Sequence, residues 1–199
     1  MKSVQLPKAY NPKDFESRIY SLWMEQRSFE PVREGAAEPP FVIVIPPPNV
    51  TGVLHMGHGL NNVLQDILIR FYRMCGRPAL WLPGTDHAGI ATQNVVERQL
   101  RKEGSSRHKV GREAFVKRTW QVKEEHHQII KRQLQNIGAS CDWSRERFTL
   151  DEGLSKAVRE VFVGLYEKDL IYQGNYLINW CHSCGTALAD DEVEHQEVT

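Results

Sequence analysis

Two histidines three positions apart, in a loop with three glycines, are the residues of this sequence best suited to chemistry on an anion. The loop is the run PPPNVTGVLHMGHG, residues 46–59, and a helical pattern follows it. Free backbone N–H groups and the positive dipole end of a helix favour negative charge, and imidazoles add further donors. Glycines allow a large flat group to approach the backbone. We therefore expect a polyphosphate to bind beside His55 and His58.

Other interpretations of this loop stay open from the residues alone. The loop is not a Walker A sequence, because GxxxxGK[ST] is absent, and it is not GxGxxG, because Asn62 occupies the last position. A structural role for His55 and His58, as helix caps or surface residues, is as good an interpretation as a role in binding. A metal pair is less favoured, because no third ligand lies nearby in the sequence.

Asp86 is a second candidate, in the run LPGTDHAGIATQ, residues 82–93. It follows the second apolar segment of the chain and precedes a helical pattern that begins near Ile90. Asp is also a preferred helix N-cap, so a purely structural capping role is the alternative.

Cys181 and Cys184 form a CxxC, which is half of a zinc knuckle. Tetrahedral zinc needs four ligands, and the chain has no second CxxC. His182 and His195 are the nearest further ligands, but His182 lies between the cysteines, where the ring geometry is awkward. Bound zinc and a pair of reduced structural cysteines both remain open.

The elements that must position these residues follow an α/β pattern. Residues 41–45, FVIVI, are continuous and mostly β-branched, which predicts a strand buried on both faces, as in a parallel sheet. A helix should follow and end at Gly76. Residues 78–83 predict a second strand, parallel to the first through a right-handed crossover. The apolar face expected for the helix consists of Leu60, Val63, Leu64, Ile67, Leu68 and Phe71.

Further elements are predicted on both sides of this βαβ unit. Asn11 and Pro12 open an amphipathic helix, and residues 31–40 form a loop. Helices are expected from about 90 to 104 and from about 112 to 137. The run TLDE, residues 149–152, has the form of a capping box and predicts a helix with one apolar face. Residues 171–178 predict a hairpin-like arrangement that leads into the CxxC.

The composition is that of an ordinary globular protein. The 199 residues are 41% hydrophobic, and the 25 basic and 25 acidic side chains give a formal net charge of zero. Disorder is therefore not expected, and the overall charge indicates no nucleic-acid or membrane partner. No apolar run is long enough to span a bilayer, and the start has no secretory signal. We expect a cytoplasmic protein with reduced thiols.

Several of these runs together resemble class I aminoacyl-tRNA synthetases. His55-Met56-Gly57-His58 is similar to the HIGH signature of that class, and Asn-Val-Thr-Gly before it is similar to its valine-specific members. GTDHAG, residues 84–89, agrees with that branch, whereas isoleucine and leucine enzymes favour a GWD-type sequence. Three more stretches agree: LPKAYNPKDFESRIYSLW, GASCDWSRERFTLDEGLSKAVREVF and NYLINWCHSCGTALADDEVEH. The resemblance covers essentially the whole chain.

The resemblance implies roles for individual residues. His55 and His58 would stabilise the phosphates of ATP as the valine carboxylate attacks the α-phosphate. Asp86 would hold the amino group of valine, and Pro46 and Pro47 would form an apolar wall against its side chain. The remaining ATP contacts would come from Pro48, Asn49, Thr51 and Gly57 together with His58. Mg²⁺ would accompany ATP, zinc is a further candidate at the CxxC, and tRNA(Val) would be the macromolecular partner of a monomeric enzyme that has no membrane partner.

The resemblance also implies a fold and a domain organisation. We expect a Rossmann-like parallel sheet with flanking helices, the amino-terminal half of a class I catalytic domain, and a small CxxC-bearing hairpin near the carboxyl end. The expected parts are a helix and loop over 1–40, the catalytic half over 41–170 and the hairpin over 171–199. No KMSKS-like lysine loop, editing domain or anticodon-binding domain is present in the sequence, which indicates an amino-terminal piece. An isoleucine enzyme and a non-catalytic nucleotide-binding fragment are the alternatives.

Overall fold

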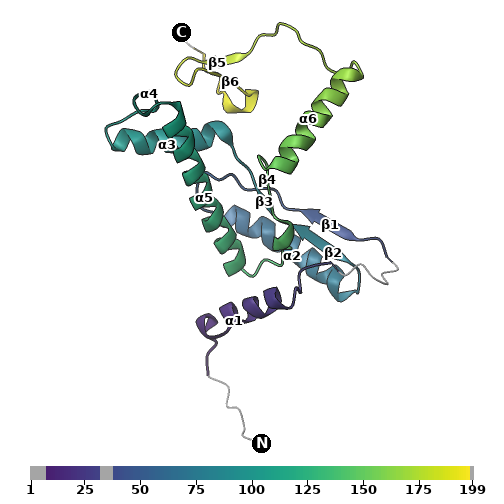
Figure 1. Ribbon diagram of the computed structural model, residues 1–199. Helices are drawn as coiled ribbons and strands as arrows, with labels where there is room; N and C mark the ends of the chain where they lie inside the picture. The colour runs from purple at the N-terminus through teal and green to yellow at the C-terminus, as the bar shows by residue number, and fades with distance from the viewer. Residues whose placement is uncertain (1–7, 32–37, 198–199) are drawn as a thin grey trace, which may run out of the picture. The chain divides into compact units, whose positions relative to one another are not determined.

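A parallel βαβ unit is present as predicted. The computed structural model describes residues 8–31 and 38–197, and in it β1 (Phe41–Val44) pairs in parallel with β2 (Ala79–Leu82), with Phe41 opposite Ala79 (Figure 1). The connection between them contains α2 (Met56–Met74). The ladder continues to Ile45, whose N–H donates to the Leu82 carbonyl at 3.0 Å. The prolines that follow Ile45 have no N–H to donate, so the regular strand ends there.

A second pair of parallel strands lies beyond the carboxyl end of β2. β3 (Gly84–Thr85) pairs with β4 (Arg147–Phe148), which follows a single 3₁₀ turn, η1 (Trp143–Arg145). A Cβ atom on Gly84 would lie 2.9 Å from the Arg147 carbonyl oxygen, so only glycine permits this approach of the two backbones.

Two clusters of apolar side chains form the core of the part of the chain that the structure describes. The larger one surrounds the fully buried Trp81 and includes Ile45, Val50, Ile69 and Ile130. The buried indole is satisfied, because its Nε1 donates to Gln65 Oε1 at 3.0 Å. The second cluster, Val96, Leu100, Phe115 and Val122, joins α3 (Gly89–Lys102) to α5 (Arg112–Asn136), with the short α4 (Arg107–Val110) between them. Helices α3 and α5 agree with the prediction.

The opening helix α1 (Pro12–Glu25) begins as predicted, with the Asn11 side chain accepting the Lys13 N–H at 3.3 Å. Tyr20 attaches α1 to the rest of this part of the chain, since its hydroxyl accepts from Trp143 Nε1 at 2.7 Å and donates to the Ala139 carbonyl at 2.9 Å. Most of the loop predicted over 31–40 lies outside the described residues.

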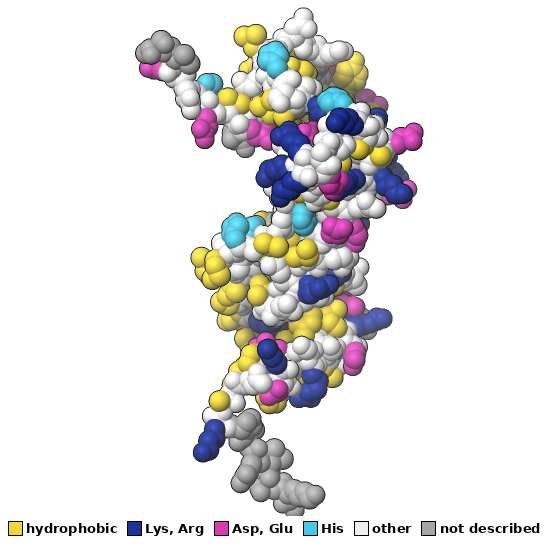
Figure 2. Space-filling model, turned by 90° about the vertical axis from the view of Figure 1, so that its left-hand side faces the viewer, with side chains coloured by type: hydrophobic (Ala, Val, Ile, Leu, Met, Phe, Trp, Pro, Cys, Tyr) yellow, Lys and Arg dark blue, Asp and Glu magenta, His cyan; other side chains and the backbone are white. Residues whose placement is uncertain are grey.

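The expected burial of β1 and α2 is wrong, although both elements form. β1 is exposed on alternate residues, with Val42 and Val44 open, and the predicted apolar face of α2 is exposed throughout. The opposite side of α2 packs through Ile69 and through polar contacts, such as Asp66 Oδ1 accepting the Ser140 N–H at 3.1 Å. Periodicity therefore identified the helix but not the face that packs. Figure 2 shows hydrophobic side chains lying open on the molecular surface.

The predicted start of α6 (Glu152–Glu167) is nearly correct, but the predicted capping residue is not. Asp151 takes that role, since its Oδ1 accepts the Leu154 N–H at 2.8 Å. The hydroxyl of Thr149 is directed elsewhere, to Asp86. No residue of α6 is buried, and Val158 and Phe162 are exposed.

The chain divides into two units, Met1–Ser155 and Lys156–Thr199. The second unit contains an antiparallel hairpin of β5 (Asn179–Cys181) and β6 (Thr186–Leu188), followed by the 3₁₀ turn η2 (Asp190–Glu192). Residues 171–178 form no strand, so the hairpin predicted there is wrong, and the CxxC lies at the turn of a later hairpin. The short polar turn closed by Gly185, at φ +66°, accounts for this position. The domain boundaries given above remain predictions. No helix of the described chain is long and apolar enough to cross a membrane.

Candidate functional site

His55 and His58 cap each other at the start of α2. The His55 Nδ1 atom accepts the Gly57 N–H at 3.1 Å, and the His58 Nδ1 atom accepts the His55 N–H at 3.3 Å. The ring centroids are 3.9 Å apart. A Cβ on Gly57 would approach His55 Cε1 to 3.0 Å, whereas a Cβ on Gly59 would meet nothing within 4 Å. The capping interpretation is therefore confirmed as local structure.

Capping also determines what the two imidazoles offer to a ligand. An Nδ1 atom that accepts a hydrogen bond carries no proton, so each neutral ring has its proton on Nε2. Partial burial, with the nearby His55 as a second cause, lowers the pKa of His58 below the ordinary value of 6.5. Both rings are thus held as Nε2–H donors at a helix N-terminus, an arrangement suited to an anion.

The loop that leads to these histidines is anchored by α5. His126 Nδ1 lies 3.0 Å from the Val50 carbonyl oxygen, and the Leu54 N–H donates to Gln133 Oε1 at 2.9 Å. Neither anchor could be predicted from the sequence, because both come from a helix whose charged pattern gives no sign of a contact more than 70 positions away. Within the loop, Thr51 is half-buried.

Asp86 pairs with residues 48–50 of the loop that follows β1. Its N–H donates to the Pro48 carbonyl at 2.9 Å, and its carbonyl accepts the Val50 N–H at 3.0 Å, which forms a parallel bridge between Asp86 and Asn49. Pro46, Pro47 and Asn49 are exposed and Pro48 is buried. The structure therefore joins the 46–49 segment to Asp86. Among the described residues, no hydrogen bond joins either imidazole of the histidine pair to Asp86.

The alternative role of Asp86 as a helix cap is wrong. The N-cap of α3 is Ala88, at φ +40°, and no side chain caps that helix. Instead Asp86 Oδ1 accepts the Thr149 hydroxyl at 2.8 Å and lies 3.3 Å from His87 Nδ1. The Asp86 side chain is 31% exposed. A half-open carboxylate of this kind suits a cationic group such as a primary ammonium.

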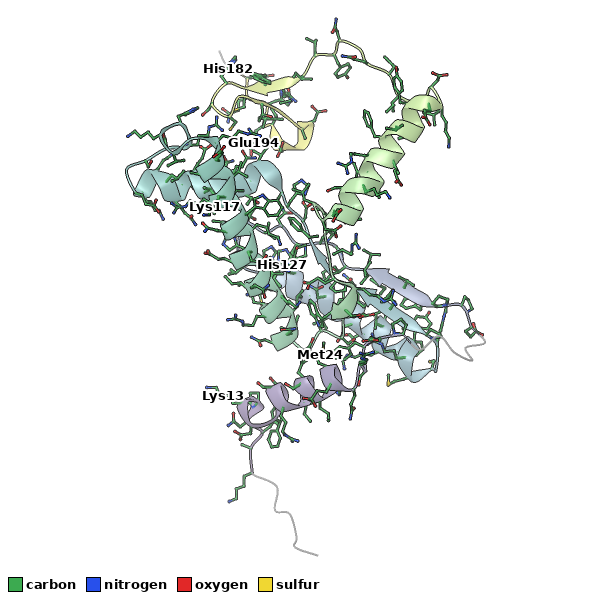
Figure 3. All side chains as sticks on the ribbon, viewed as in Figure 1. Lys13, Met24, Lys117, His127, His182 and Glu194 are labelled. Atoms are coloured by element: carbon green, nitrogen blue, oxygen red, sulfur yellow. The ribbon has the colours of Figure 1, made fainter. Side chains whose placement is uncertain are left out.

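A cluster of buried and half-buried polar side chains contacts Thr85, the residue before Asp86. Thr85 Oγ1 is 2.9 Å from Nδ1 of His127, a residue of α5 labelled in Figure 3. His127 Nε2 lies 3.4 Å from Glu146 Oε1, and Lys131 Nζ lies 2.6 Å from Glu146 Oε2. Burial lowers the pKa of His127, and the Glu146 carboxylate opposes this shift. No site was predicted at His127 from the sequence, because a histidine within a long charged helix gives no local signal of burial.

The CxxC forms a tight turn that brings together too few metal ligands among the described residues. The Cys181 sulfur accepts the Cys184 N–H at 3.4 Å, and backbone donation from Cys184, followed by its thiol and the Ser183 N–H, lowers the pKa of Cys181. His182 belongs to the same turn (Figure 3). Within 8–31 and 38–197, no three His, Cys, Asp or Glu side chains converge on one point. These residues therefore supply at most two of four zinc ligands.

Comparisons with known proteins agree on one family. The family model described as tRNA synthetases class I (I, L, M and V) matches residues 18–199. The chain is 61% identical over 197 residues to the valine–tRNA ligase of Treponema denticola, covering 99% of this chain and 22% of that protein. It is 64% identical over 193 residues to the valine–tRNA ligase of Syntrophotalea carbinolica, covering 97% of this chain and 21% of that protein.

A solved structure supports the same fold. A crystal structure of the ternary complex of Agrobacterium radiobacter K84 agnB2 LeuRS with tRNA and LeuAMS is similar to 94% of this chain, with a TM-score of 0.75. The two sequences are 23% identical, and the match covers 22% of that structure's chain. The likeness establishes the expected class I catalytic fold.

Proposed function

The chain belongs to the class I tRNA synthetase family, and from that premise we propose that it forms the part of a valine–tRNA ligase that binds ATP and valine. Identities of 61% and 64% to valine–tRNA ligases over nearly the whole chain support valine rather than isoleucine. The chain spans about a fifth of the length of those relatives. The complete reaction and its partners are therefore part of the proposal.

The observation that carries the proposal is the backbone bridge between Asn49 and Asp86. It pairs the backbone of Asp86, whose carboxylate is partly open, with the segment that runs from the exposed Pro46 and Pro47 to the capped histidine pair. An ammonium group on Asp86 would leave the side chain of valine against Pro46 and Pro47. A wall of this kind excludes larger side chains by steric clash, although it separates valine poorly from threonine, which has a similar shape.

In the proposed reaction, a carboxylate oxygen of valine attacks the α-phosphorus of ATP. A new P–O bond forms, and the bond from that phosphorus to the oxygen bridging to the β-phosphate breaks, so pyrophosphate leaves with the electron pair. The Nε2–H groups of His55 and His58 would donate to phosphate oxygens as negative charge shifts between them. Pro48, Asn49, Thr51 and Gly57 would complete the ATP contacts. ATP would enter as its Mg²⁺ complex.

The second half-reaction belongs to the same proposal. The terminal hydroxyl of tRNA(Val) would attack the carbonyl carbon of valyl-adenylate, and AMP would leave. Cys181 and Cys184 would supply two of the four ligands of a structural zinc ion, because the turn directs backbone N–H groups to the Cys181 sulfur. The proposal also includes that the full-length enzyme is cytoplasmic and monomeric.

The test is a chimera in which this chain replaces the matching 197 residues of the Treponema denticola enzyme. We expect ATP–pyrophosphate exchange that depends on valine, with much weaker dependence on isoleucine. Exchange that depends mainly on isoleucine would establish the isoleucine alternative. Absence of exchange in a folded chimera, whose remaining part is that of the valine enzyme, would establish the non-catalytic alternative.

A further inference from the structure

Thr149 has a hydroxyl group with three polar neighbours and one proton to share among them. Its Oγ1 lies 2.8 Å from Asp86 Oδ1, 2.9 Å from the His87 backbone nitrogen and 2.6 Å from His87 Nδ1. The backbone N–H of His87 can only donate, so it uses one acceptor position of the hydroxyl oxygen. The hydroxyl proton is therefore donated either to the Asp86 carboxylate or to His87 Nδ1.

The carboxylate receives this proton. A carboxylate oxygen is an acceptor only, so a hydroxyl oxygen at 2.8 Å without a proton between them would be repulsive. Hydrogen bonds to an ionised acceptor are also stronger than those to a neutral ring nitrogen. Thr149 therefore donates to Asp86, and the 2.6 Å contact requires a proton on His87 Nδ1, which donates to Thr149.

The position of Thr149 is itself fixed by the backbone. Its N–H donates to the Thr85 carbonyl at 3.2 Å, directly after the paired strands β3 and β4. The neighbouring His87 ring lies edge-on to Phe148, with ring centroids 6.5 Å apart. The hydroxyl thus approaches Asp86 from a paired backbone and not from a free loop.

This arrangement uses one oxygen of Asp86 and leaves the other open. Among the described residues, Oδ1 receives the Thr149 hydroxyl and the nearby His87 Nδ1, and no hydrogen bond or ion pair engages Oδ2. We propose that Thr149 is a positioning residue that fixes the Asp86 carboxylate so that Oδ2 receives the ammonium group of the amino acid substrate. This inference rests on the proposed function.

The test uses the chimera with Thr149→Val, which keeps the branched shape and removes the hydroxyl. We expect the KM for valine to rise about ten- to a hundredfold while kcat changes little. The lost hydrogen bond to the charged Asp86 affects the binding of valine equally in the ground state and in the transition state. Thr149→Ser keeps the hydroxyl and should restore most of the affinity. Thr119→Val is the matched control, because among the described residues the Thr119 hydroxyl bonds only to the Phe115 carbonyl of its own helix.

Two inhibitors separate an effect on the ammonium contact from a general loss of the site. Valinol keeps the ammonium group of valine without the carboxylate, and 3-methylbutanoate keeps the carboxylate without the ammonium group. In Thr149→Val the inhibition constant of valinol should rise in parallel with the KM for valine. That of 3-methylbutanoate should stay within about twofold, because it makes no contact with Asp86 Oδ2.

The outcomes distinguish the two proposals. An equal rise for both inhibitors, or unchanged constants for both, would overturn the positioning role while leaving the proposed function intact. A loss of thermal stability in Thr149→Val with normal constants in the folded protein would overturn it as well. Absence of valine-dependent exchange in the unsubstituted chimera would overturn the proposed function and this inference together.

Discussion

The imidazole of His58 accepts the backbone N–H of His55 at 3.3 Å, and the imidazole of His55 accepts the N–H of Gly57. The same pair of rings therefore caps the N-terminus of α2 and, in the proposed function, binds the phosphates. The two roles use different nitrogen atoms, because capping engages Nδ1 and leaves Nε2 for a ligand. Substitutions that keep one nitrogen's function and remove the other's can separate the roles.

His55→Asn and His55→Ala form such a pair. Asparagine is a preferred N-cap, so His55→Asn should retain the stability of α2, whereas His55→Ala should lower the free energy of unfolding by about 1 kcal/mol. Both remove the Nε2–H donor, and both should lower the kcat of pyrophosphate exchange in the chimera by about 10²-fold or more. Urea denaturation and exchange kinetics measure the two effects. If the kcat of His55→Asn equals that of the natural sequence, His55 caps the helix and does not contribute to the reaction.

Gly59→Ala should raise stability and impair nucleotide binding. Gly59 lies in the first turn of α2, and its added Cβ would meet nothing within 4 Å, so the free energy of unfolding should rise by up to about 1 kcal/mol. The same methyl group would occupy the space through which a flat group approaches the backbone. The KM for ATP should therefore rise while the KM for valine stays constant. An unchanged KM for ATP would place the nucleotide elsewhere.

His127 should make the stability of the chain sensitive to acid. Its pKa lies below 6.5 in the folded protein, mainly through burial, while Glu146 and Glu124 oppose and Lys123 and Lys131 reinforce the shift. The unfolded state therefore binds a proton at higher pH than the folded state, so stability is fully present above about pH 6.5 and falls as the pH drops through the folded-state pKa.

The measurement is the urea midpoint at about pH 8 and about pH 5 for the natural sequence and for His127→Gln. The pKa of His58 is also lowered in the folded protein, so protonation of His58 reduces stability at low pH in every variant. The informative quantity is therefore the difference between variants in how far the urea midpoint falls. His127→Gln should lose less stability on acidification than the natural sequence. His108→Gln, at an exposed position of α4, should behave like the natural sequence. Equal acid sensitivity in His127→Gln would contradict the assignment.

Asp151 and Thr149 should respond differently to substitution, although both stand at the start of α6. Asp151→Ala removes the acceptor for the Leu154 N–H and should lower the stability of the helix by about 1 kcal/mol, while Asp151→Asn should retain most of it. Neither should alter the KM for valine. Circular dichroism during urea denaturation and exchange kinetics in the chimera test this. A raised KM in Asp151→Ala would show that the cap also supports the site.

The sequence predicted the elements better than it predicted their packing. Local patterns suffice for the start of α1 at Asn11 and for the existence of the strands β1 and β2, because capping and strand formation depend on nearby residues. The parallel pairing of these strands followed from the general rule for strands joined by a helix. The contacts of Thr149 with Asp86 and of Thr85 with His127 join residues 63 and 42 positions apart. The hydrophobic periodicity of the sequence carries no information about contacts between residues so far apart. The same limit explains the error on α2, where polar contacts of Asp66 and Gln65 determine the packed side.

The 199-residue chain alone should activate valine at most weakly. Phosphoryl transfer depends on groups placed around the phosphorus, and the family's lysine-bearing KMSKS-like loop does not occur in this sequence. Losing one well-placed donor reduces rates by about 10²–10³-fold, so loss of that loop should reduce exchange by at least this factor relative to the chimera. Charging of tRNA should be undetectable.

The purified chain and the chimera are assayed side by side for pyrophosphate exchange and for valyl-tRNA formation. A His55→Asn preparation of the chain, purified in the same way, measures contamination by host synthetase, since any rate that it shares with the natural sequence comes from the host. Exchange and charging by the chain alone at the rate of the chimera would contradict the prediction. That result would require a second set of phosphate-binding groups within these 199 residues. Lysine-to-alanine substitutions on α5 would be the first test for such groups.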